Sequence, residues 1–403
     1  VGFGLWCFLF LSQGPIYPPL VICAIAVVIA LRQKNLPIAI LLIAVASYYA
    51  RISRWTWMYA PGLWAGMLAL ISLKNPTFKN GRWKELVRPV VLGLSGLAGA
   101  EYIPVIITWF ARGQVAAEGS ITVALADSFN FKQAMLWDRL LPNPTYSPGI
   151  LLGYVWVGGP ILLFLAWMIV KRFWKPNWMQ GASLAVIIGG FSVVGLIISV
   201  KVGGGSNLHN LDLLWLTLAL LSAWVFRDWL DRGLPGLYDV KTVLVLLCLV
   251  MVFPTTSMIQ YGEPYGAPAE YFVTSSLKKL QAEVDNAKVK GEVLFMDQRQ
   301  LLTFGYIKGV PLVAEYEKKL VMDKSLSGSQ VYFDAFYKDL QNHRFSMIIS
   351  EPLQKAMADE SIRNFAEENN SWVYWVSRPL LKYYKPSVTY DEVGVQVLVP
   401  REN

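Results

Sequence analysis

Residues 149–170 have the sequence GILLGYVWVGGPILLFLAWMIV, which contains no charged side chain, and Lys171 and Arg172 follow directly. An apolar run of about 20 residues is long enough for a helix to cross the hydrocarbon core of a bilayer. Lysine and arginine directly after such a run are typical of its cytoplasmic end. This stretch therefore predicts a transmembrane helix, and similar runs elsewhere in the chain decide its fold.

Apolar runs of this kind fill most of the chain before residue 258. The sequence is 55% hydrophobic and only 16% charged, a composition too apolar for a soluble protein of 403 residues. We expect a polytopic α-helical membrane protein with about nine transmembrane helices. These helices cover residues 2–12, 18–31, 36–50, 56–73, 87–110, 149–170, 180–200, 210–226 and 241–258.

Lysine and arginine are divided unevenly between the loops that alternate along these spans. One set of loops holds Arg32, Lys34, Lys74, Lys79, Arg82, Lys84, Arg88, Lys171, Arg172, Lys175, Arg227, Arg232 and Lys241. The other set holds Arg51, Arg54, Arg112, Lys132, Arg139 and Lys201. The positive-inside rule assigns the richer set to the cytoplasm. We therefore expect a multi-pass protein of the plasma (inner) membrane, with loops 13–17, 51–55, 111–148 and 201–209 and everything after about residue 259 outside the cytoplasm.

The formal net charge of +8 is explained by these cytoplasmic loops, and an anionic lipid or lipid phosphate is the alternative explanation. Nucleic acid is not an expected partner, because the basic residues flank spans and form no stripe. All three cysteines lie in apolar runs and there are only two histidines, so these residue types predict no metal cluster. The sequence names no certain cofactor, and a divalent cation stays an alternative.

A second domain follows the transmembrane domain of residues 1–258. Pro264, Gly266 and Pro268 indicate a linker over residues 259–269. Helical and strand patterns then alternate, which predicts an α/β domain over residues 270–403, with helices on both faces of a sheet. We expect helices at Ala269–Lys288, Gln298–Tyr306, Gln330–Gln341 and Ser361–Asn369. We expect strands at Glu292–Met296, Pro311–Ala314, Phe345–Ser350, Trp372–Val376 and Gly394–Val399.

Acidic residues of this domain fall at or after the ends of predicted strands. They are Asp297, Glu315, Glu317 and Glu351. Ligands of open α/β sheets bind at this edge. Solvated surface acids are the alternative interpretation, because no glycine-rich nucleotide fingerprint accompanies them.

The outer loop of residues 111–148 is the longest loop between spans. Residues Phe131–Leu141 have apolar side chains three and four apart, which predicts a short amphipathic helix in the membrane interface, and Pro142–Thr145 ends it. Asp127 and Asp138 on this loop are the candidate catalytic residues, since a general base would need a carboxylate close to the outer membrane surface. Ordinary solvated loop acids are the alternative.

The stretch Lys201–Asn210, with the sequence KVGGGSNLHN, connects two late spans. Three glycines allow a ligand to approach the backbone closely, and the free N–H groups of the helix that follows favour an anion. Lys201 and His209 can add charge or hydrogen-bond donors, so this loop is a candidate anion site. A flexible turn with an asparagine or serine helix cap is the alternative.

Two further positions combine charge with an apolar setting. Arg51 and Arg54 lie outside, between Tyr48, Tyr49, Trp55 and Trp57. Guanidinium groups suit phosphate oxygens, whereas the alternative is interfacial anchoring. Glu101 lies inside the predicted span 87–110, where a charge is expensive and turns toward a polar site or a hydrogen-bond partner.

The span layout, the outer loop with its interfacial helix, the Lys-Gly-Gly-Gly-Ser-Asn loop and the external domain together resemble the C-type glycosyltransferases, in particular the protein-mannosyltransferase-like, or dolichyl-phosphate-mannose-dependent, group. The resemblance implies transfer of a sugar from a polyprenyl-phosphate carrier to an acceptor outside the cytoplasm. It also implies that Lys201, Asn207, His209, Arg51 and Arg54 hold the lipid phosphate.

One feature of that family is missing from this sequence. The family carries its catalytic carboxylate in the first outer loop, but residues Ser12–Pro18 contain no acid. Because the chain starts with Val1 at the edge of an apolar run, we expect it to lack its N-terminal part, with the base upstream. The alternative function is a non-catalytic structural or accessory subunit of a larger membrane complex.

Overall fold

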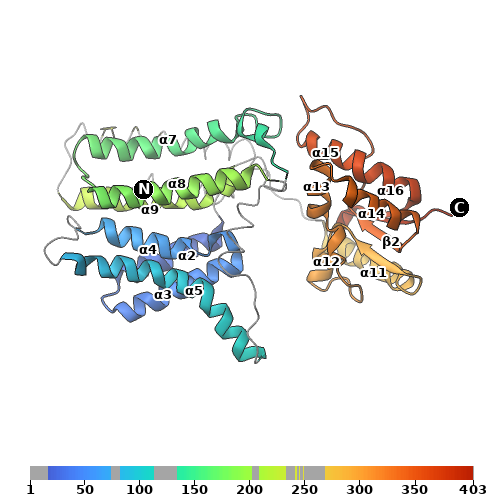
Figure 1. The fold of residues 1–403 in the computed structure, drawn as a ribbon, viewed down its shortest axis with the longest axis horizontal. Coiled ribbons are helices and arrows are strands. Elements are labelled where there is room, and N and C mark those ends of the chain that lie inside the picture. The colour runs from blue at the N-terminus through green and yellow to red at the C-terminus, as the bar shows by residue number, and fades with distance from the viewer. Residues whose placement is uncertain are drawn as a thin grey trace.

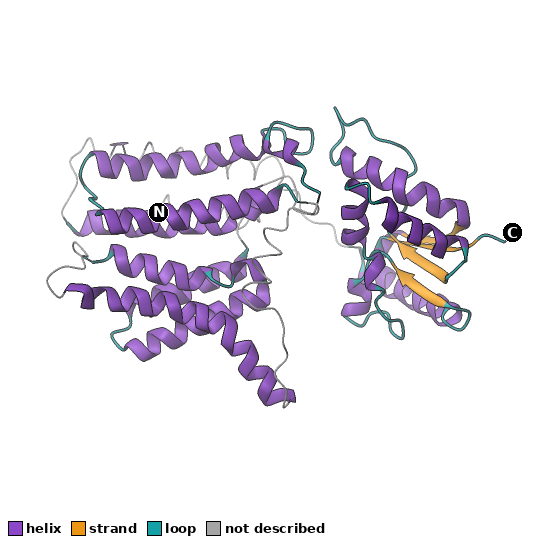
Figure 2. Ribbon diagram, viewed as in Figure 1, coloured by secondary structure: helices purple, strands orange, loops and turns teal. Residues whose placement is uncertain are grey.

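The computed structural model describes residues 17–73, 82–112, 134–201, 208–232, 241–242, 245, 248 and 268–402. A bundle of apolar helices forms the N-terminal part, and an α/β domain forms the C-terminal part (Figures 1 and 2). The predicted span at 2–12 and nearly all of the one at 241–258 lie outside the described residues.

Seven bundle helices overlap the seven remaining predicted spans. They are α2 (Pro18–Arg32), α3 (Leu36–Ser53), α4 (Ala60–Ile71), α5 (Val87–Arg112), α7 (Gly149–Val170), α8 (Trp178–Ser199) and α9 (Asp212–Asp231). Within the described ranges, 5 helices are long and apolar enough to cross a membrane, namely Leu36–Ser53, Trp83–Phe110, Gly149–Val170, Trp178–Ser199 and Leu208–Asp231. The predicted span 56–73 is shorter than expected, because a 3₁₀ turn at Trp55–Trp57 precedes α4.

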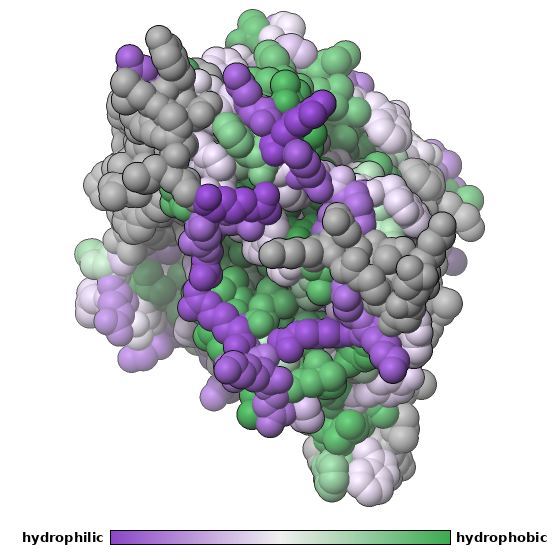
Figure 3. Space-filling model, turned by 90° about the vertical axis from the view of Figure 1, so that its left-hand side faces the viewer, coloured by the Kyte–Doolittle hydropathy of each residue, from purple (hydrophilic) through white to green (hydrophobic). Residues whose placement is uncertain are grey.

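The described residues of the two loop sets lie at opposite ends of the bundle. At one end, Arg88 donates a hydrogen bond of 2.6 Å to the Gln33 carbonyl oxygen, and Arg232 donates one of 3.2 Å to the carbonyl oxygen of Phe173. Figure 3 looks onto this end and shows hydrophilic side chains gathered there. The other end faces the C-terminal domain (Figure 1). The alternation of loops along the sequence therefore corresponds to the two ends of the bundle.

Small residues allow α3, α4 and α5 to pack closely. A Cβ at Gly96 of α5 would lie 2.3 Å from the Cα of Gly62 in α4, and one at Gly99 would lie 2.3 Å from the carbonyl oxygen of Ala44 in α3. Helices within membranes associate through such small residues, because lipid tails leave little hydrophobic driving force between them. These glycines therefore determine how α5 fits against its two neighbours.

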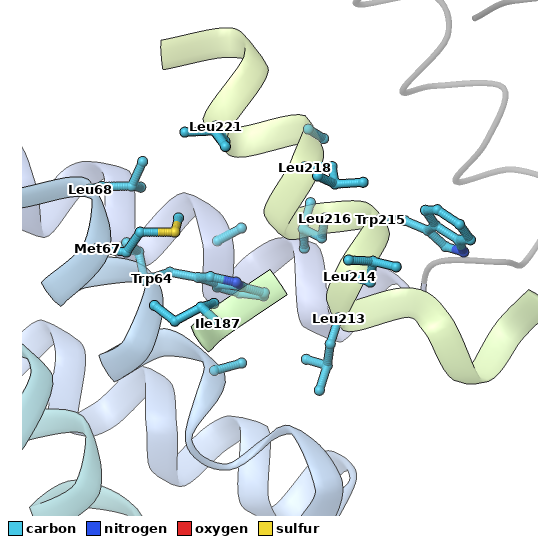
Figure 4. Close-up of a cluster of buried hydrophobic side chains, with 14 of the residues drawn as sticks. Trp64, Met67, Leu68, Ile187, Leu213, Leu214, Trp215, Leu216, Leu218 and Leu221 are labelled. Atoms are coloured by element: carbon cyan, nitrogen blue, oxygen red, sulfur yellow. The ribbon is translucent and has the colours of Figure 1, made fainter. Parts of the chain in front are cut away.

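The helices α4 and α9 contact each other and so join helices α2–α5 to helices α7–α9. Trp64 of α4 points toward α9 (Figure 4), and its Nε1 donates a hydrogen bond of 2.7 Å to Oγ1 of Thr217. Both side chains are fully buried, so the hydrogen bond satisfies polar groups that lie within an otherwise apolar cluster. Met67, Leu68, Leu214 and Leu218 complete this part of the core.

The C-terminal domain has a four-stranded sheet of order β1-β2-β4-β3. Its strands are β1 (Glu292–Phe295), β2 (Phe345–Ser350), β3 (Tyr384–Tyr390) and β4 (Val395–Pro400). The pair β1–β2 is parallel, and β4 is antiparallel to both β2 and β3. Its helices are α11 (Glu270–Ala287), α12 (Gln300–Thr303), α13 (Lys318–Leu326), α14 (Gln330–Gln341), α15 (Ala366–Trp372) and α16 (Arg378–Tyr383).

Apolar side chains of the sheet alternate between two buried clusters, as the sequence predicts for a sheet covered on both faces. Phe295 packs in the cluster that contains Leu280 of α11. Leu294, its neighbour on β1, packs in the cluster that contains Phe333 and Phe336 of α14. The period of two along a strand produces this division.

Several predicted local elements were wrong. Residues 372–376 are helical, because Trp372, Val376 and Leu380 lie one turn apart and pack in the same cluster as Phe333. Their aromatic and β-branched side chains suggested a strand, but tertiary packing overrides that preference. Residues 311–314 form no strand, and α13 and β3 were not predicted. The strand β3 carries Pro386, which is compatible with its position at the sheet edge.

We predict that Gly96→Val destabilises the bundle by about 1–3 kcal/mol, because the added side chain would overlap α4. Thermal unfolding in detergent measures the effect. Gly189→Val in α8 is the matched control, since a Cβ there would meet no atom of another described segment within 4 Å. Equal losses of stability in the two variants would contradict the packing described above.

Candidate functional site

The described residues among the sequence-predicted phosphate ligands lie at the bundle end that faces the C-terminal domain. Arg51 is on the last turn of α3, Arg54 follows that helix, and His209 precedes α9. Lys201 pairs with Met135, which precedes α7, in an isolated antiparallel bridge. The candidate residues Asp127 and Asn207 lie outside the described residues.

Arg54 is held by groups from three separate segments. Its Nη2 donates a hydrogen bond of 2.8 Å to Oδ1 of Asn210, and its Nη1 lies 3.6 Å from Oδ2 of Asp212. The guanidinium carbon lies 5.9 Å from the ring centroid of Tyr17 and 5.6 Å from that of Trp57. Aromatic faces attract cations at these distances. Although it is held in this way, the side chain is still 27% exposed.

Asp212 is the partner that the sequence prediction missed. Its side chain is only 2% exposed, at the first residue of α9. Oδ2 accepts a hydrogen bond of 2.8 Å from Nε1 of Trp57, and Oδ1 accepts one of 2.7 Å from the backbone N–H of Leu213. The signal was available, because an acid at the edge of an apolar run is as unusual as Glu101. Asn210 lies beside the predicted candidate His209 but was not assigned a role.

His209 extends the aromatic part of this group. Its ring meets the ring of Tyr17 edge-on, with the centroids 6.5 Å apart. Tyr17 in turn contacts Trp57 at a centroid distance of 5.6 Å. The term Arg54 cluster is used below for Tyr17, Arg54, Trp57, His209, Asn210 and Asp212. The cluster brings two of the predicted phosphate ligands, Arg54 and His209, into one place.

Arg51 and Glu101 form a separate pair. The Arg51 guanidinium donates a hydrogen bond of 2.8 Å to the carbonyl oxygen of Ala100 and lies 3.6 Å from Oε2 of Glu101. The hydroxyl of Tyr59 donates a hydrogen bond of 2.7 Å to Oε1 of Glu101. The intramembrane acid thus faces polar partners from α3 and from the residue before α4, as its position in an apolar helix predicts.

A buried arginine of the loop between α5 and α7 connects the bundle to the C-terminal domain. Arg139 is 3% exposed, and its Nη2 lies 2.8 Å from Oε1 of Glu367 and 2.5 Å from Oε1 of Glu368, both on α15. Its guanidinium also lies 5.6 Å from the ring centroid of Phe365. Asp138, the candidate catalytic base beside it, is exposed. The neighbour of the candidate base therefore forms ion pairs between the two domains.

The structure corrects the amphipathic helix predicted over residues 131–141. Only Trp137–Leu140 are helical, as a 3₁₀ turn, among its described residues. The backbone N–H of Leu136 instead donates to the carbonyl oxygen of Val200 at 2.7 Å. That of Ala134 donates to Oδ1 of Asp323 in α13 at 3.0 Å. These long-range partners satisfy the backbone groups that an interfacial helix would have paired internally.

The four acids predicted at the sheet edge lie in three different settings. Asp297 and Glu351 meet at Lys318, whose Nζ lies 2.5 Å from Oδ2 of Asp297 and 2.7 Å from Oε2 of Glu351. Glu315 lies 3.2 Å from the guanidinium of Arg344. Glu317 caps α13 by accepting a hydrogen bond from the backbone N–H of Lys319. Within the described ranges, no three His, Cys, Asp or Glu side chains are placed to hold a metal ion.

No protein-family model matches this chain, and no curated protein or solved structure is significantly similar to it. The functional argument therefore rests on the geometry of its own residues.

We predict that Arg139→Gln loosens the contact between the bundle and the C-terminal domain. The substitution leaves Glu367 and Glu368 without their cation, and breaking a buried ion pair costs on the order of 3 kcal/mol or more. Hydrogen–deuterium exchange should become faster in peptides that cover residues 134–148 and 365–372. Arg378→Gln, at an exposed position of α16, should leave both peptides unchanged, and the same result for Arg139→Gln would contradict this role.

Proposed function

We propose that this chain is a membrane glycosyltransferase-like protein. It binds a polyprenyl-phosphate sugar at the Arg54 cluster and transfers the sugar to an acceptor outside the cytoplasm. In this proposal about nine helices cross the plasma (inner) membrane. The C-terminal domain and the Arg54 cluster then lie on the outer side. The location of basic residues at the opposite end of the bundle supports this orientation.

The observation that carries the proposal is the geometry of Arg54. A guanidinium has five N–H donors, and Arg54 uses only one of them in a hydrogen bond to a described residue. Two aromatic rings and Asn210 fix its orientation, which reduces the entropy that binding would otherwise cost. The exposed part of the fork can therefore receive phosphate oxygens at the end of the bundle where a lipid headgroup lies.

The chemistry assigned to this site needs a cation for the departing phosphate and a base for the acceptor. Arg54 stabilises the negative charge that develops on the phosphate as the bond to the sugar breaks. An outer-loop carboxylate removes the proton of the acceptor hydroxyl. Asp138 is the candidate that the structure describes, and its exposure agrees with that role. Lys201, Asn207 and Asp127 remain proposed members of the site.

A second candidate function is that of a non-catalytic structural or accessory subunit. The observation that favours it is that both candidate arginines already have carboxylates beside them. Arg51 faces Glu101 and Arg54 faces Asp212, so each pair is electrically neutral. Such pairs are also what a purely structural bundle would need to keep its buried acids satisfied.

We predict that Arg54→Gln weakens binding of a polyprenyl-phosphate hexose by about 10- to 100-fold, because charged hydrogen bonds contribute ~1.5–3 kcal/mol. Binding is measured by native mass spectrometry in nanodiscs, and transfer by the release of polyprenyl phosphate. Arg54→Lys keeps the charge but not the guanidinium fork. Its affinity should lie between those of the unchanged protein and Arg54→Gln.

The matched control is Arg227→Gln, since this arginine is 70% exposed on the last turns of α9, at the opposite end of the bundle. This variant should bind the polyprenyl-phosphate hexose and release polyprenyl phosphate as the unchanged protein does. If the unchanged protein binds no lipid phosphate but co-purifies with a stoichiometric partner, the subunit function replaces the transferase. If Arg54→Gln binds and transfers normally while still folded, the site is elsewhere.

We predict that the C-terminal domain reacts with membrane-impermeant maleimide in intact cells. Residues 270–403 contain no cysteine, so Val331→Cys, at a position that is 84% exposed, reports on the domain once the three native cysteines are replaced. Lys175→Cys, at the exposed opposite end of the bundle, should react only after permeabilisation. The reverse pattern would overturn the proposed orientation.

A further inference from the structure

The C-terminal domain has an open cleft at the carboxyl ends of β1 and β2. Its volume is about 430 Å³, within the range of roughly 300–1,000 Å³ that is typical of small-molecule sites. A second hollow of about 310 Å³ adjoins it and shares Asp297, Lys318 and Glu368 with it. Parallel strands place ligands at this edge of an α/β sheet.

Acidic side chains around the cleft lie beside basic partners. Lys318 contacts Asp297 and Glu351. Glu368 is paired with Arg139, which does not itself line the cleft. Burial would lower the pKa of Lys318, but its hydrogen bonds to Asp297 and Glu351 outweigh burial and raise that pKa above its ordinary value. Lys318 therefore stays charged beside both acids. A cleft with paired charges favours a neutral polar ligand over a strongly charged one.

Three of the backbone amides around the cleft already have hydrogen-bond partners and are not available to a phosphate. The N–H of Lys318 donates to the carbonyl oxygen of Met296 at 3.0 Å. That of Leu353 donates to Oε1 of Gln396 at 3.2 Å, and that of Phe365 donates to Oγ1 of Thr145 at 2.9 Å. Phosphate sites instead depend on free, converging amides at a helix or loop.

The remaining lining combines hydrogen-bonding groups with aromatic rings. Glu351 is 51% exposed, and Arg363 is exposed and forms no ion pair with a described residue. The ring of Phe365 is 43% exposed, and Trp372 supplies a second ring of which 9% is exposed. Carboxylates accept from hydroxyl groups, guanidinium groups donate to them, and apolar ring faces cover C–H groups.

From these features we propose that the cleft binds a small neutral saccharide. Sugar hydroxyl groups donate to Glu351 and Asp297 and accept from Arg363, while a C–H face of the sugar ring lies on Phe365. The wall of the cleft also connects to the bundle, because Glu368 lines the cleft and contacts Arg139 of the outer loop. A bound saccharide would therefore lie at the side of the domain that docks on the bundle.

The saccharide site is distinct from the lipid-phosphate site proposed at Arg54. Its test uses no lipid substrate, so the failure of one proposal leaves the other standing. The full chain is placed in nanodiscs, because alkyl-glycoside detergents would compete. The probes are the neutral disaccharides maltose, cellobiose, mannobiose and diacetylchitobiose, measured by saturation-transfer NMR and calorimetry. We expect saturable binding of at least one of them.

Arg363→Gln and Glu351→Gln should each weaken this binding about tenfold, since each removes a charged hydrogen-bonding group. The matched controls are Arg378→Gln and Glu402→Gln, which change exposed residues outside the cleft and should bind as the unchanged chain does. Saccharide binding that neither cleft variant alters would overturn the assignment. So would binding of a neutral tetra-alanine peptide or of inorganic phosphate with no binding of any disaccharide.

Discussion

A charged side chain that leaves water loses several kcal/mol of hydration unless an opposite charge and hydrogen bonds replace the water. This constraint shapes the bundle end that faces the C-terminal domain. Asp212 and Glu101 lie on predominantly apolar helices, and each is met by an arginine at the end of α3. Arg51 lies on the last turn of α3 and Arg54 directly follows it, so the end of α3 contacts both α5 and α9 through ion pairs.

The same constraint connects the two domains. Arg139 leaves water almost completely, and two glutamates of α15 surround its guanidinium. The loop that carries it also pairs with Lys201 after α8, so the C-terminal domain is held against two segments of the bundle. The candidate lipid-phosphate site therefore lies on the bundle side of this contact between the domains, and the cleft lies on the side of the α/β domain.

Much of the fold could be predicted because its causes are local. Length and hydropathy are enough to locate an apolar helix, and the seven described bundle helices overlap seven predicted spans. Strands β1, β2 and β4 were found because continuous apolar runs identify buried strands. The errors occur where local preference and packing disagree. Residues 372–376 have strand-forming side chains, but the spacing of their buried positions is helical.

The sequence by itself determined that the chain is built for a membrane, which residues are expensive to bury, and that an α/β domain follows. These properties depend on composition and on neighbours along the chain. Only the tertiary structure decided the partners. Asp212 lies far along the chain from Arg54, and Glu367 lies far from Arg139, so no spacing rule connects them. A single sequence shows which charges need partners, whereas the folding of distant segments onto each other decides which partners they find.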